Sequence, residues 1–350
     1  MCNSSPMSAK IKFGCLPTVI GSMPHTDHQE ACRLLLRYTP AVPAWPQLPR
    51  RSFRENMYVQ FSEGLPGIDI NMEEERISVD RSGDLDPALE ELYIAYMEND
   101  TTRYAVSHDY AAGLHAFLDS RIEPPLAVKG QVTGPISLGL SLTDGVYYVI
   151  YDDTLAEAMA RHLRLKASWQ EKALSRISSN TIIFVDEPYL TSLGTSFVSL
   201  PWERVVALLE ETLGGISGLK GLHCCGSADW SLLLSLPIDI LSFDAYNYTD
   251  ALSLYPAEAK SFLEHGGTVA WGIVPNDEEA LAKETVASIK DRLEEAMAPL
   301  TRDGIRFGQL IEQGLLTPSC GLASLSVEAA EQVLELLAQL SSNLRKRHTV

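Results

Sequence analysis

The chain has 350 residues, of which 45% are hydrophobic, so it can bury the core of one large domain or two ordinary ones and is not a disordered chain. Its 46 acidic residues outnumber the 28 lysines and arginines, and the resulting formal charge of -18 disfavours binding to nucleic acid or to an anionic membrane surface. No apolar run approaches the roughly 18 to 20 residues that span a bilayer, and the first residues, MCNSSPMSAKIKFG, lack the apolar stretch of a signal peptide, so we expect a soluble cytoplasmic protein.

Short β-type stretches alternate with helical patterns along the whole chain, and no Ser/Gly/Pro-rich linker divides them. Eight stretches are expected to be strands: residues 16–21, 41–45, 126–131, 181–186, 219–224, 238–243, 268–272 and 315–317. Alternating strands and helices in an undivided chain imply parallel pairing, and eight such repeats imply an α/β fold of the (β/α)8 TIM-barrel type. We therefore expect a single domain over residues 1–350, with residues 1–12 as a flexible N-terminus.

The helical patterns between these stretches have recognisable starts and buried faces. Thr154 and Glu157 have the spacing of a capping box, and another helix is expected from Asp277 to about Met297. The helix after Thr154 and the last helix, after Ser326, are expected to bury Leu155, Met159, His162 and Leu163 in the first case and Val333, Leu334, Leu337 and Leu340 in the second. Residues 51–117 are richer in helix than one repeat needs, and we expect an elaborated helical insertion between the second and third strands.

The residues that follow the expected strands are unusually polar. In a barrel of this type the active site lies at the C-terminal ends of the strands. The side chains expected at that rim are Gly21, Ser22, Gln131, Thr133, Asp186, Glu187, His223, Cys225, Asp244 and Cys320.

A metal site is one interpretation of the segment GLHCCGSADW, residues 221–230. Side chains alternate along an extended segment, so His223 and Cys225 point to one side and Cys224 to the other. Cys320, after the eighth strand, and Asp244, after the sixth, would reach the same rim and complete a tetrahedral zinc set. The alternative is that the cysteines are core residues and the histidine satisfies a backbone carbonyl. We assign Cys224 to packing, because adjacent cysteines lack the two-residue spacing of thioredoxin-type redox sites.

Two further segments each allow a structural and a functional interpretation. Asp186, in VDEPYL, either lies in a solvated turn or binds the ammonium group of a substrate. Gly21 and Ser22, in TVIGSMPH, either form a tight turn or allow close backbone approach and donate hydrogen bonds to a carboxylate.

Together these segments resemble the catalytic barrel of cobalamin-independent methionine synthase, within the wider uroporphyrinogen decarboxylase-like superfamily. The matching pieces are IGSMP (20–24), KGQVTGP (129–135), VDEP (185–188), HCC (223–225), SFD (242–244) and PSCGL (318–322). The resemblance implies that a Zn²⁺ ion is bound by His223, Cys225 and Cys320, with Asp244 as the nearest match to the family's glutamate ligand. It also implies that Ile20, Gly21 and Ser22 hold the carboxylate of L-homocysteine and that Asp186 holds its amino group. Gln60, in MYVQF, lies near the place where the family has a substrate-binding glutamate.

The chain departs from that family in ways that bear on the methyl donor. It has room only for the catalytic barrel, without the additional N-terminal barrel that helps the long enzymes to bind folate. Where the family has a general-acid histidine, residues 274–276 read Val-Pro-Asn. A methyl group leaves folate nitrogen only when that nitrogen is protonated, so a general acid is needed, whereas a methyl group on corrinoid cobalt leaves without one.

The sequence thus resembles the short core methionine synthases. The expected activity is transfer of a methyl group from a methylcorrinoid, as methylcobalamin or a methylated corrinoid protein, to L-homocysteine, giving L-methionine without methyltetrahydrofolate. The alternatives are methyl transfer to another thiol such as coenzyme M, a uroporphyrinogen decarboxylase-like enzyme, and a structural zinc site.

Overall fold

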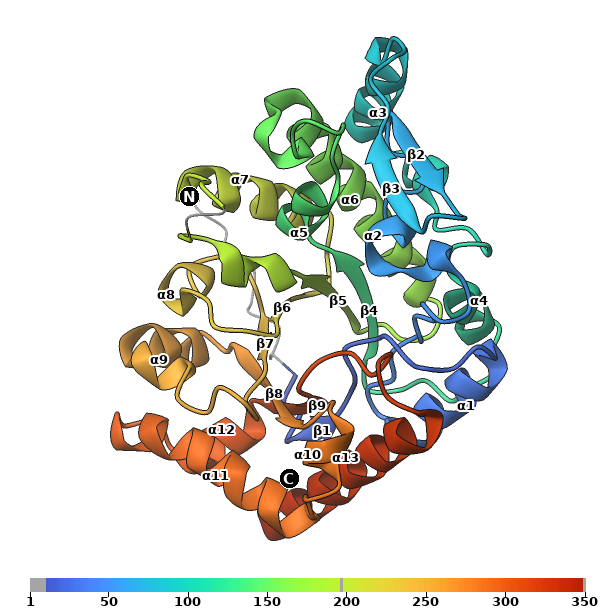
Figure 1. Cartoon of the computed structure of the whole chain (residues 1–350). Coiled ribbons are helices and arrows are strands. Elements are labelled where there is room, and N and C mark those ends of the chain that lie inside the picture. The colour runs from blue at the N-terminus through green and yellow to red at the C-terminus, as the bar shows by residue number, and fades with distance from the viewer. Residues whose placement is uncertain (1–10, 196–197, 349–350) are drawn as a thin grey trace, which may run out of the picture.

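The computed structural model describes residues 11–195 and 198–348, and at its centre is a curled parallel sheet surrounded by helices (Figure 1). The sheet has seven strands in the order β1-β9-β8-β7-β6-β5-β4. Their bounds are Leu16–Pro17 (β1), Val128–Thr133 (β4), Thr181–Asp186 (β5), Leu219–Cys224 (β6), Ile240–Phe243 (β7), Thr268–Val274 (β8) and Gly314–Pro318 (β9). The expected strands 181–186 and 219–224 are confirmed to the residue, and the alternation of strands and helices gives the predicted parallel pairing. Of the expected N-terminus 1–12, residues 1–10 lie outside the described residues, and Lys12 pairs with Glu312 at 2.6 Å.

The predicted second strand, residues 41–45, is wrong as a regular strand. Pro43 and Pro46 have no N–H to donate, so this segment cannot form a continuous ladder with both neighbours. It makes isolated parallel bridges instead, Ala44 with Lys129 of β4 and Gln47 with Ser22 beyond β1. The regular sheet is therefore seven-stranded, and an irregular segment lies between β1 and β4 where the second strand was expected. The predicted first strand, 16–21, is regular only over its first two residues.

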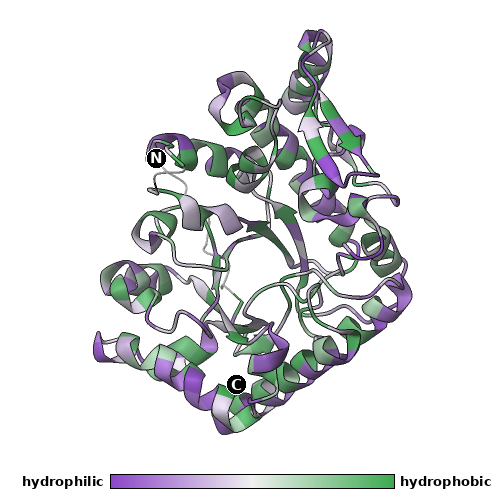
Figure 2. Ribbon diagram, in the orientation of Figure 1, coloured by the Kyte–Doolittle hydropathy of each residue, from purple (hydrophilic) through white to green (hydrophobic). Residues whose placement is uncertain are grey.

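The helices cover the outside of the sheet. The longer ones are α1 (His28–Tyr38), α6 (Asp153–Leu174), α7 (Trp202–Leu213), α9 (Pro256–Glu264), α11 (Val286–Arg302) and α13 (Val327–His348). The shorter ones are α4 (Ala112–Leu118), α5 (Pro135–Ser141), α8 (Trp230–Leu233), α10 (Glu278–Leu281) and α12 (Phe307–Glu312), with single 3₁₀ turns η3 (Val149–Tyr151), η4 (Pro188–Ser192) and η5 (Leu252–Leu254). Polar residues lie on the outer faces of α11 and α13, whereas the strands are mostly apolar (Figure 2). None of the described helices combines the length and the apolar composition that a membrane-spanning helix needs.

Two helix boundaries differ from the predictions, while the predicted buried faces of α6 and α13 are confirmed. Helix α6 begins at Asp153, and its N-cap is Asp152, two residues before Thr154, because the side chain of Asp152 accepts a hydrogen bond from the N–H of Leu155 at 2.9 Å. The single helix expected from Asp277 to Met297 is two helices, α10 and α11, because Thr285 and Ser288 form a capping box that starts the second one.

The insertion between residues 51 and 117 contains an unpredicted hairpin as well as helices. Strands β2 (Ile68–Asn71) and β3 (Arg76–Val79) pair antiparallel, and α3 (Asp86–Glu98) follows them. The 3₁₀ turns η1 (Phe53–Glu55) and η2 (Thr101–Tyr104) and the short helix α2 (Met57–Gln60) complete the insertion. The hairpin and α3 extend beyond the ring of helices, whereas α2 lies close to the C-terminal end of β4 (Figure 1). The insertion therefore has one part that projects outward and one part that reaches the mouth of the sheet.

The inward face of the sheet changes character along the strands. Ile182, Phe184, Ile240, Ala270 and Leu315 form an apolar cluster inside the curl. Alternation along the same strands then places Asp186, His223, Ser242 and Thr317 further toward the C-terminal ends, all buried. Apart from Lys129 and Gln131 of β4, the polar side chains of this face thus lie at the C-terminal mouth, above an apolar floor.

Candidate metal centre

Three side chains from two distant parts of the chain converge at the C-terminal mouth of the sheet. His223 lies near the end of β6, Cys225 follows that strand directly, and Cys320 follows β9. One ligand atom of each lies within 4.8 Å of the other two, and no other group of His, Cys, Asp or Glu in the described ranges 11–195 and 198–348 meets this criterion. The parallel sheet brings both strand ends to the same edge, as the sequence analysis expected.

His223 presents one ring nitrogen to this cluster without a partner. Its Nδ1 lies 3.0 Å from the hydroxyl oxygen of Ser242 on the neighbouring strand β7. Its Nε2 is buried and has no hydrogen-bond partner among the described residues. A histidine held by one nitrogen with the other left unpaired has the arrangement that metal-binding histidines adopt.

The two thiols are close enough to affect each other's ionisation. The neighbouring Cys320 thiol and His223 imidazole lower the pKa of the Cys225 thiol to about 4, which favours its thiolate form at neutral pH. The Cys225 sulfur, together with burial, raises the pKa of the Cys320 thiol. One imidazole nitrogen and two sulfurs form a soft donor set of the kind that Zn²⁺ prefers, so these residues fit a zinc ion.

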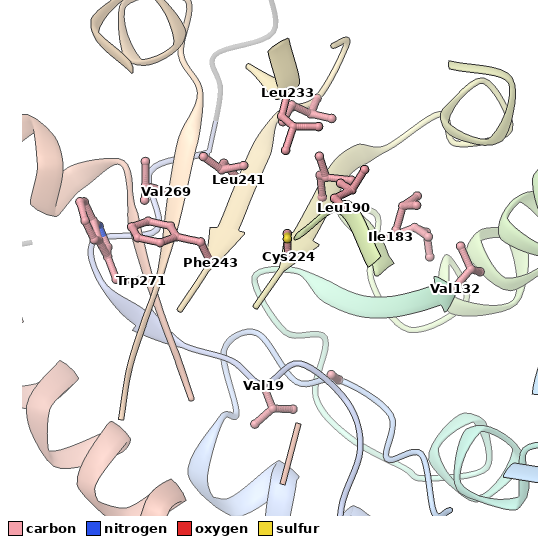
Figure 3. Packing of buried hydrophobic residues seen from close by; sticks show 14 of the residues in the cluster. Val19, Val132, Ile183, Leu190, Cys224, Leu233, Leu241, Phe243, Val269 and Trp271 are labelled. Carbon is pink, nitrogen blue, oxygen red and sulfur yellow. The ribbon is translucent and has the colours of Figure 1, made fainter. Parts of the chain in front are cut away.

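Cys224 belongs to the core, as predicted. It is fully buried and lies in the apolar cluster on the outer side of the sheet, which also holds Leu190 and Phe243 (Figure 3). Burial raises the pKa of its thiol to about 12, so it is not a thiolate. Neighbouring residues 224 and 225 therefore have opposite environments, because side chains alternate across the sheet.

Asp244, the expected fourth ligand, lies outside the three-residue group. It follows β7, and both of its carboxylate oxygens are engaged by Asn247, one by the backbone N–H at 2.9 Å and one by the side-chain amide at 2.7 Å. Burial raises the pKa of this carboxyl group. The sequence placed Asp244 at the correct edge of the sheet, but it could not show that the following turn engages the carboxylate.

A pocket of about 380 Å³ opens directly onto the cluster. Besides the three metal-ligand candidates, it is lined by Ile20, Ser22, Gln47, Pro49, Glu55, Asn56, Met57, Tyr58, Asp186, Pro188, Asn276, Gly321, Ala323 and Ser324. These residues come from the ends of β1, β5, β8 and β9 and from the insertion. The pocket thus joins three of the predicted substrate residues, Ile20, Ser22 and Asp186, to three of the predicted metal ligands, whereas Gly21, Gln60 and Asp244 do not line it.

Asp186 contributes an unpaired carboxylate oxygen to this pocket. It ends β5 on the inward face, and its Oδ1 is buried without a hydrogen-bond partner in the described part of the chain. Burial raises the pKa of this carboxyl to about 6, and the charges of Lys129 and His223 partly oppose that rise. A buried carboxylate without a partner fits a cationic group of a ligand.

Gly21 occupies a position that no other residue fits. Its φ is 152°, and a Cβ there would lie 2.7 Å from the amide carbon of Gln131 and 2.9 Å from Gln47 Oε1. The N–H groups of Gly21 and Ser22 donate to no acceptor within residues 11–195 and 198–348. Two adjacent unpaired amides at the pocket wall fit an anionic group of a ligand.

Gln60, the remaining predicted substrate residue, does not line the pocket. It is fully buried on α2, where its Oε1 accepts a hydrogen bond from Gln47 at 2.8 Å and its amide donates to the carbonyl of Tyr110. Gln60 therefore reaches the pocket only through Gln47. Gln60 lies in the insertion, where the match to the motif is loose, and the motif could not locate it relative to the pocket.

Several pocket residues were not singled out by the sequence. Tyr58 and Glu55 come from the insertion, where the segment RENMYVQF carries no strand or metal pattern. The Tyr58 and Tyr189 rings lie 6.2 Å apart, and Glu55 pairs with Arg51 at 2.6 Å. Asn276 entered the sequence argument only because it is not a general-acid histidine. In the structure its side chain accepts a hydrogen bond from Ser319 at 2.8 Å and donates one to the Gly321 carbonyl at 3.2 Å. These two bonds hold the loop that carries Cys320.

Glu187, next to Asp186, has a structural position. Its two oxygens accept hydrogen bonds from the N–H groups of Ile136 and Ser137 at 2.9 and 2.8 Å, at the start of α5. Burial raises the pKa of this carboxyl to about 7. Of the two acidic residues in VDEP, only Asp186 faces the pocket.

Comparisons with known proteins support the fold. No protein-family model matches the chain, and no curated protein matches it. Its structure is similar to that of a B12-independent methionine synthase from Shewanella sp. W3-18-1 in complex with selenomethionine, with a TM-score of 0.59, 17% sequence identity, and coverage of 95% of this chain and 98% of that chain. At this identity the similarity shows that the two chains share a related α/β fold over almost their whole length.

Proposed function

We propose that this protein is a zinc-dependent methyltransferase of the core methionine synthase type, which transfers a methyl group from a methylcorrinoid to L-homocysteine to give L-methionine. The observation that carries the proposal is the convergence of His223, Cys225 and Cys320 beside a pocket that Asp186, Ile20 and Ser22 also line. The N–H groups of Gly21 and Ser22, in that segment, have no acceptor within the described residues. The related fold of a methionine synthase that binds selenomethionine supports the proposal.

The donor set suits the chemistry that the reaction needs. A bound Zn²⁺ ion would hold the homocysteine sulfur as a thiolate at neutral pH, where a free thiol with a pKa of about 8.5 is mostly protonated and a poor nucleophile. The unpaired Nε2 of His223 and the two sulfurs are the residues that would hold the ion. In this proposal Asp244 is the replaceable fourth ligand, and it would give up the hydrogen bonds of Asn247 when it binds.

The rest of the pocket would orient the amino-acid end of the substrate. The carboxylate of Asp186 would accept the ammonium group, and the N–H groups of Gly21 and Ser22 would donate to the carboxylate. With the ammonium and carboxylate groups both held, the sulfur would be directed toward the three metal-ligand candidates. The substrate would then lose its orientational freedom on binding, before the methyl transfer.

The methyl donor is inferred from the residue at the end of β8. Asn276 lines the pocket beside the Cys320 loop, and its amide has no proton to release at neutral pH. A methyl group on folate nitrogen needs such a proton, and a methyl group on cobalt does not. We therefore propose methylcobalamin or a methylated corrinoid protein as the donor, although the similar enzyme from Shewanella is described as B12-independent.

Two other reactions are less well supported by the pocket. A sulfonated thiol such as coenzyme M has no ammonium group for Asp186, and its negative charge would be repelled by that carboxylate. A porphyrinogen decarboxylase has no need for two thiols and an imidazole at one rim. Methyl transfer to several thiols, measured side by side, separates these alternatives from homocysteine methylation.

The direct test compares two cysteine variants. Cys320→Ser should lose bound zinc and methyl transfer together, because the loss of a direct ligand should exceed the roughly 10- to 100-fold cost of losing an outer-shell partner. Cys224→Ala is the matched control, since Cys224 lies one residue from Cys225 but packs in the core, and it should keep both properties. A Cys320→Ser protein with stoichiometric zinc would remove Cys320 from the site and contradict the proposal.

A further inference from the structure

Lys129 is a buried cation that the proposed reaction does not use. It lies on β4 with no exposed surface, on the inward face of the sheet. No ion pair within 4.0 Å is found for it in the described residues, although the charge of Asp186 acts on it from further away, and burying an ammonium group without a direct partner is costly. A buried charge with this cost needs a compensating role.

The ammonium group is held by three contacts. It donates a hydrogen bond to the backbone carbonyl of Ile20 at 2.7 Å and another to Gln131 Oε1 at 3.2 Å, and it lies 4.3 Å from the centre of the Phe184 ring. Lys129 does not line the pocket, whereas Ile20 does. Its shortest contact is thus with the backbone of the pocket wall.

That contact fixes the orientation of one peptide group. The peptide bond between Ile20 and Gly21 is trans, as are the others in the described part of the chain, so its C=O and N–H point in opposite directions. Lys129 binds the C=O, and the side chain of Gln131 fills the space beside Gly21. The N–H of Gly21 is therefore held on the side of the peptide away from Lys129, and it has no acceptor within the described ranges.

We propose that Lys129 is a positioning residue for substrate recognition, which holds the Ile20–Gly21 peptide so that its N–H binds the carboxylate of an amino-acid ligand. Lys129 would act through the backbone and would not touch the ligand. The inference rests on the proposed function, since it requires that the pocket takes an amino acid. It goes further by assigning carboxylate recognition to a residue behind the pocket wall.

The test measures the carboxylate contribution with two ligands that differ only in that group. L-Methionine and 3-(methylthio)propylamine are titrated calorimetrically into the full-length, zinc-loaded chain, and neither probe requires turnover. Wild-type protein should bind L-methionine more tightly. Lys129→Met should lower the preference for L-methionine over the amine at least about tenfold, the effect of one lost hydrogen bond to a charged group. Both ligands carry the ammonium group, so the effect of the lost charge on Asp186 cancels in this ratio.

The chain offers a matched control in Lys166, which is equally buried but lies on α6. Lys166→Met should leave the affinities for both ligands as in wild type. Lys129→Gln is measured as well, because it keeps a polar side chain too short to reach the Ile20 carbonyl, and it should show the same selective loss. Lys129→Met replaces a buried charge by an apolar chain of similar length, so we expect it to fold.

The outcomes separate this inference from the proposed function. Suppose that the wild type prefers L-methionine to the amine and that both Lys129 variants show the same preference. That result would overturn only the role of Lys129. An equal loss for both ligands would make Lys129 a structural residue and overturn the inference as well. A wild-type protein that binds neither ligand would overturn both the inference and the proposed function.

Discussion

Lys166 carries its charge inside the helical layer, and this gives the folded chain a specific pH dependence. Burial lowers the pKa of its ammonium group from 10.5 to about 8, partly opposed by Glu63, 3.8 Å away. Below pH 8 both the folded and the unfolded chain carry this charge, and the folded state bears the full cost of burying it. Between pH 8 and 10.5 the unfolded chain binds more protons, so the free energy of unfolding rises with pH across that window.

We predict that the substitution Lys166→Met removes this dependence. Relative to the variant, the wild type should gain about 3 kcal/mol in free energy of unfolding between pH 7.5 and 10.5, because one pKa unit corresponds to about 1.4 kcal/mol. Urea unfolding of both proteins at several pH values measures the difference, in which the titration of other groups cancels. Parallel pH profiles would show that Lys166 titrates normally in the folded state.

At the level of single residues, the sequence predicted the side-chain positions that follow from alternation along a strand, and it missed the contacts that depend on loop conformation. His223 and Cys225 share a side because they are two residues apart on an extended segment, and this holds in the structure. Asp244 is engaged by Asn247 and Gln60 by Gln47, and these contacts depend on turns that alternation does not describe. Lys129 could not be predicted, because a lysine in a strand gives no sign that it faces a buried carbonyl.

At the level of elements, strand ends were easier to predict than strand continuity. The strand β5, TIIFVD, is rich in β-branched residues, whereas β6, LKGLHC, has none, and the bounds of both were predicted to the residue. The proline spacing of residues 40–49 was the available signal that the segment 41–47 would form isolated bridges only. The β2–β3 hairpin was missed because residues 68–79 lie in a region interpreted as helical, although IDIN and RISV alternate in the way that strands do.

The loop after β8 predicts the choice of methyl donor. Since Asn276 offers no proton, methyltetrahydrofolate should be a donor at less than about one hundredth of the rate with methylcobalamin, given that a general acid typically contributes 10²- to 10⁴-fold. The measurement is methionine formation from L-homocysteine with each donor in turn, under otherwise identical conditions. Comparable turnover with methyltetrahydrofolate would show that another group in the pocket protonates the leaving nitrogen, and the donor assignment would be wrong.

At the level of the whole molecule, the site depends on the curl of the sheet. Residues 223 and 225 come from β6 and its end, whereas residue 320 follows β9, and these strands are separated in the sheet by β7 and β8. Only a curled sheet brings the ends of β6 and β9 together, so the metal cluster exists in the folded chain alone. The pattern of strands and helices predicted this curl correctly, although not the irregular segment between β1 and β4.

The central claim is that the zinc site formed by His223, Cys225 and Cys320 leaves room for an incoming thiol. X-ray absorption at the zinc edge, on zinc-loaded protein with and without L-homocysteine, tests it most directly. We predict two sulfur ligands without the thiol and three with it, because the chain supplies two sulfurs and the substrate a third. An unchanged ligand set after saturation with homocysteine would identify a closed, structural zinc site and contradict the account.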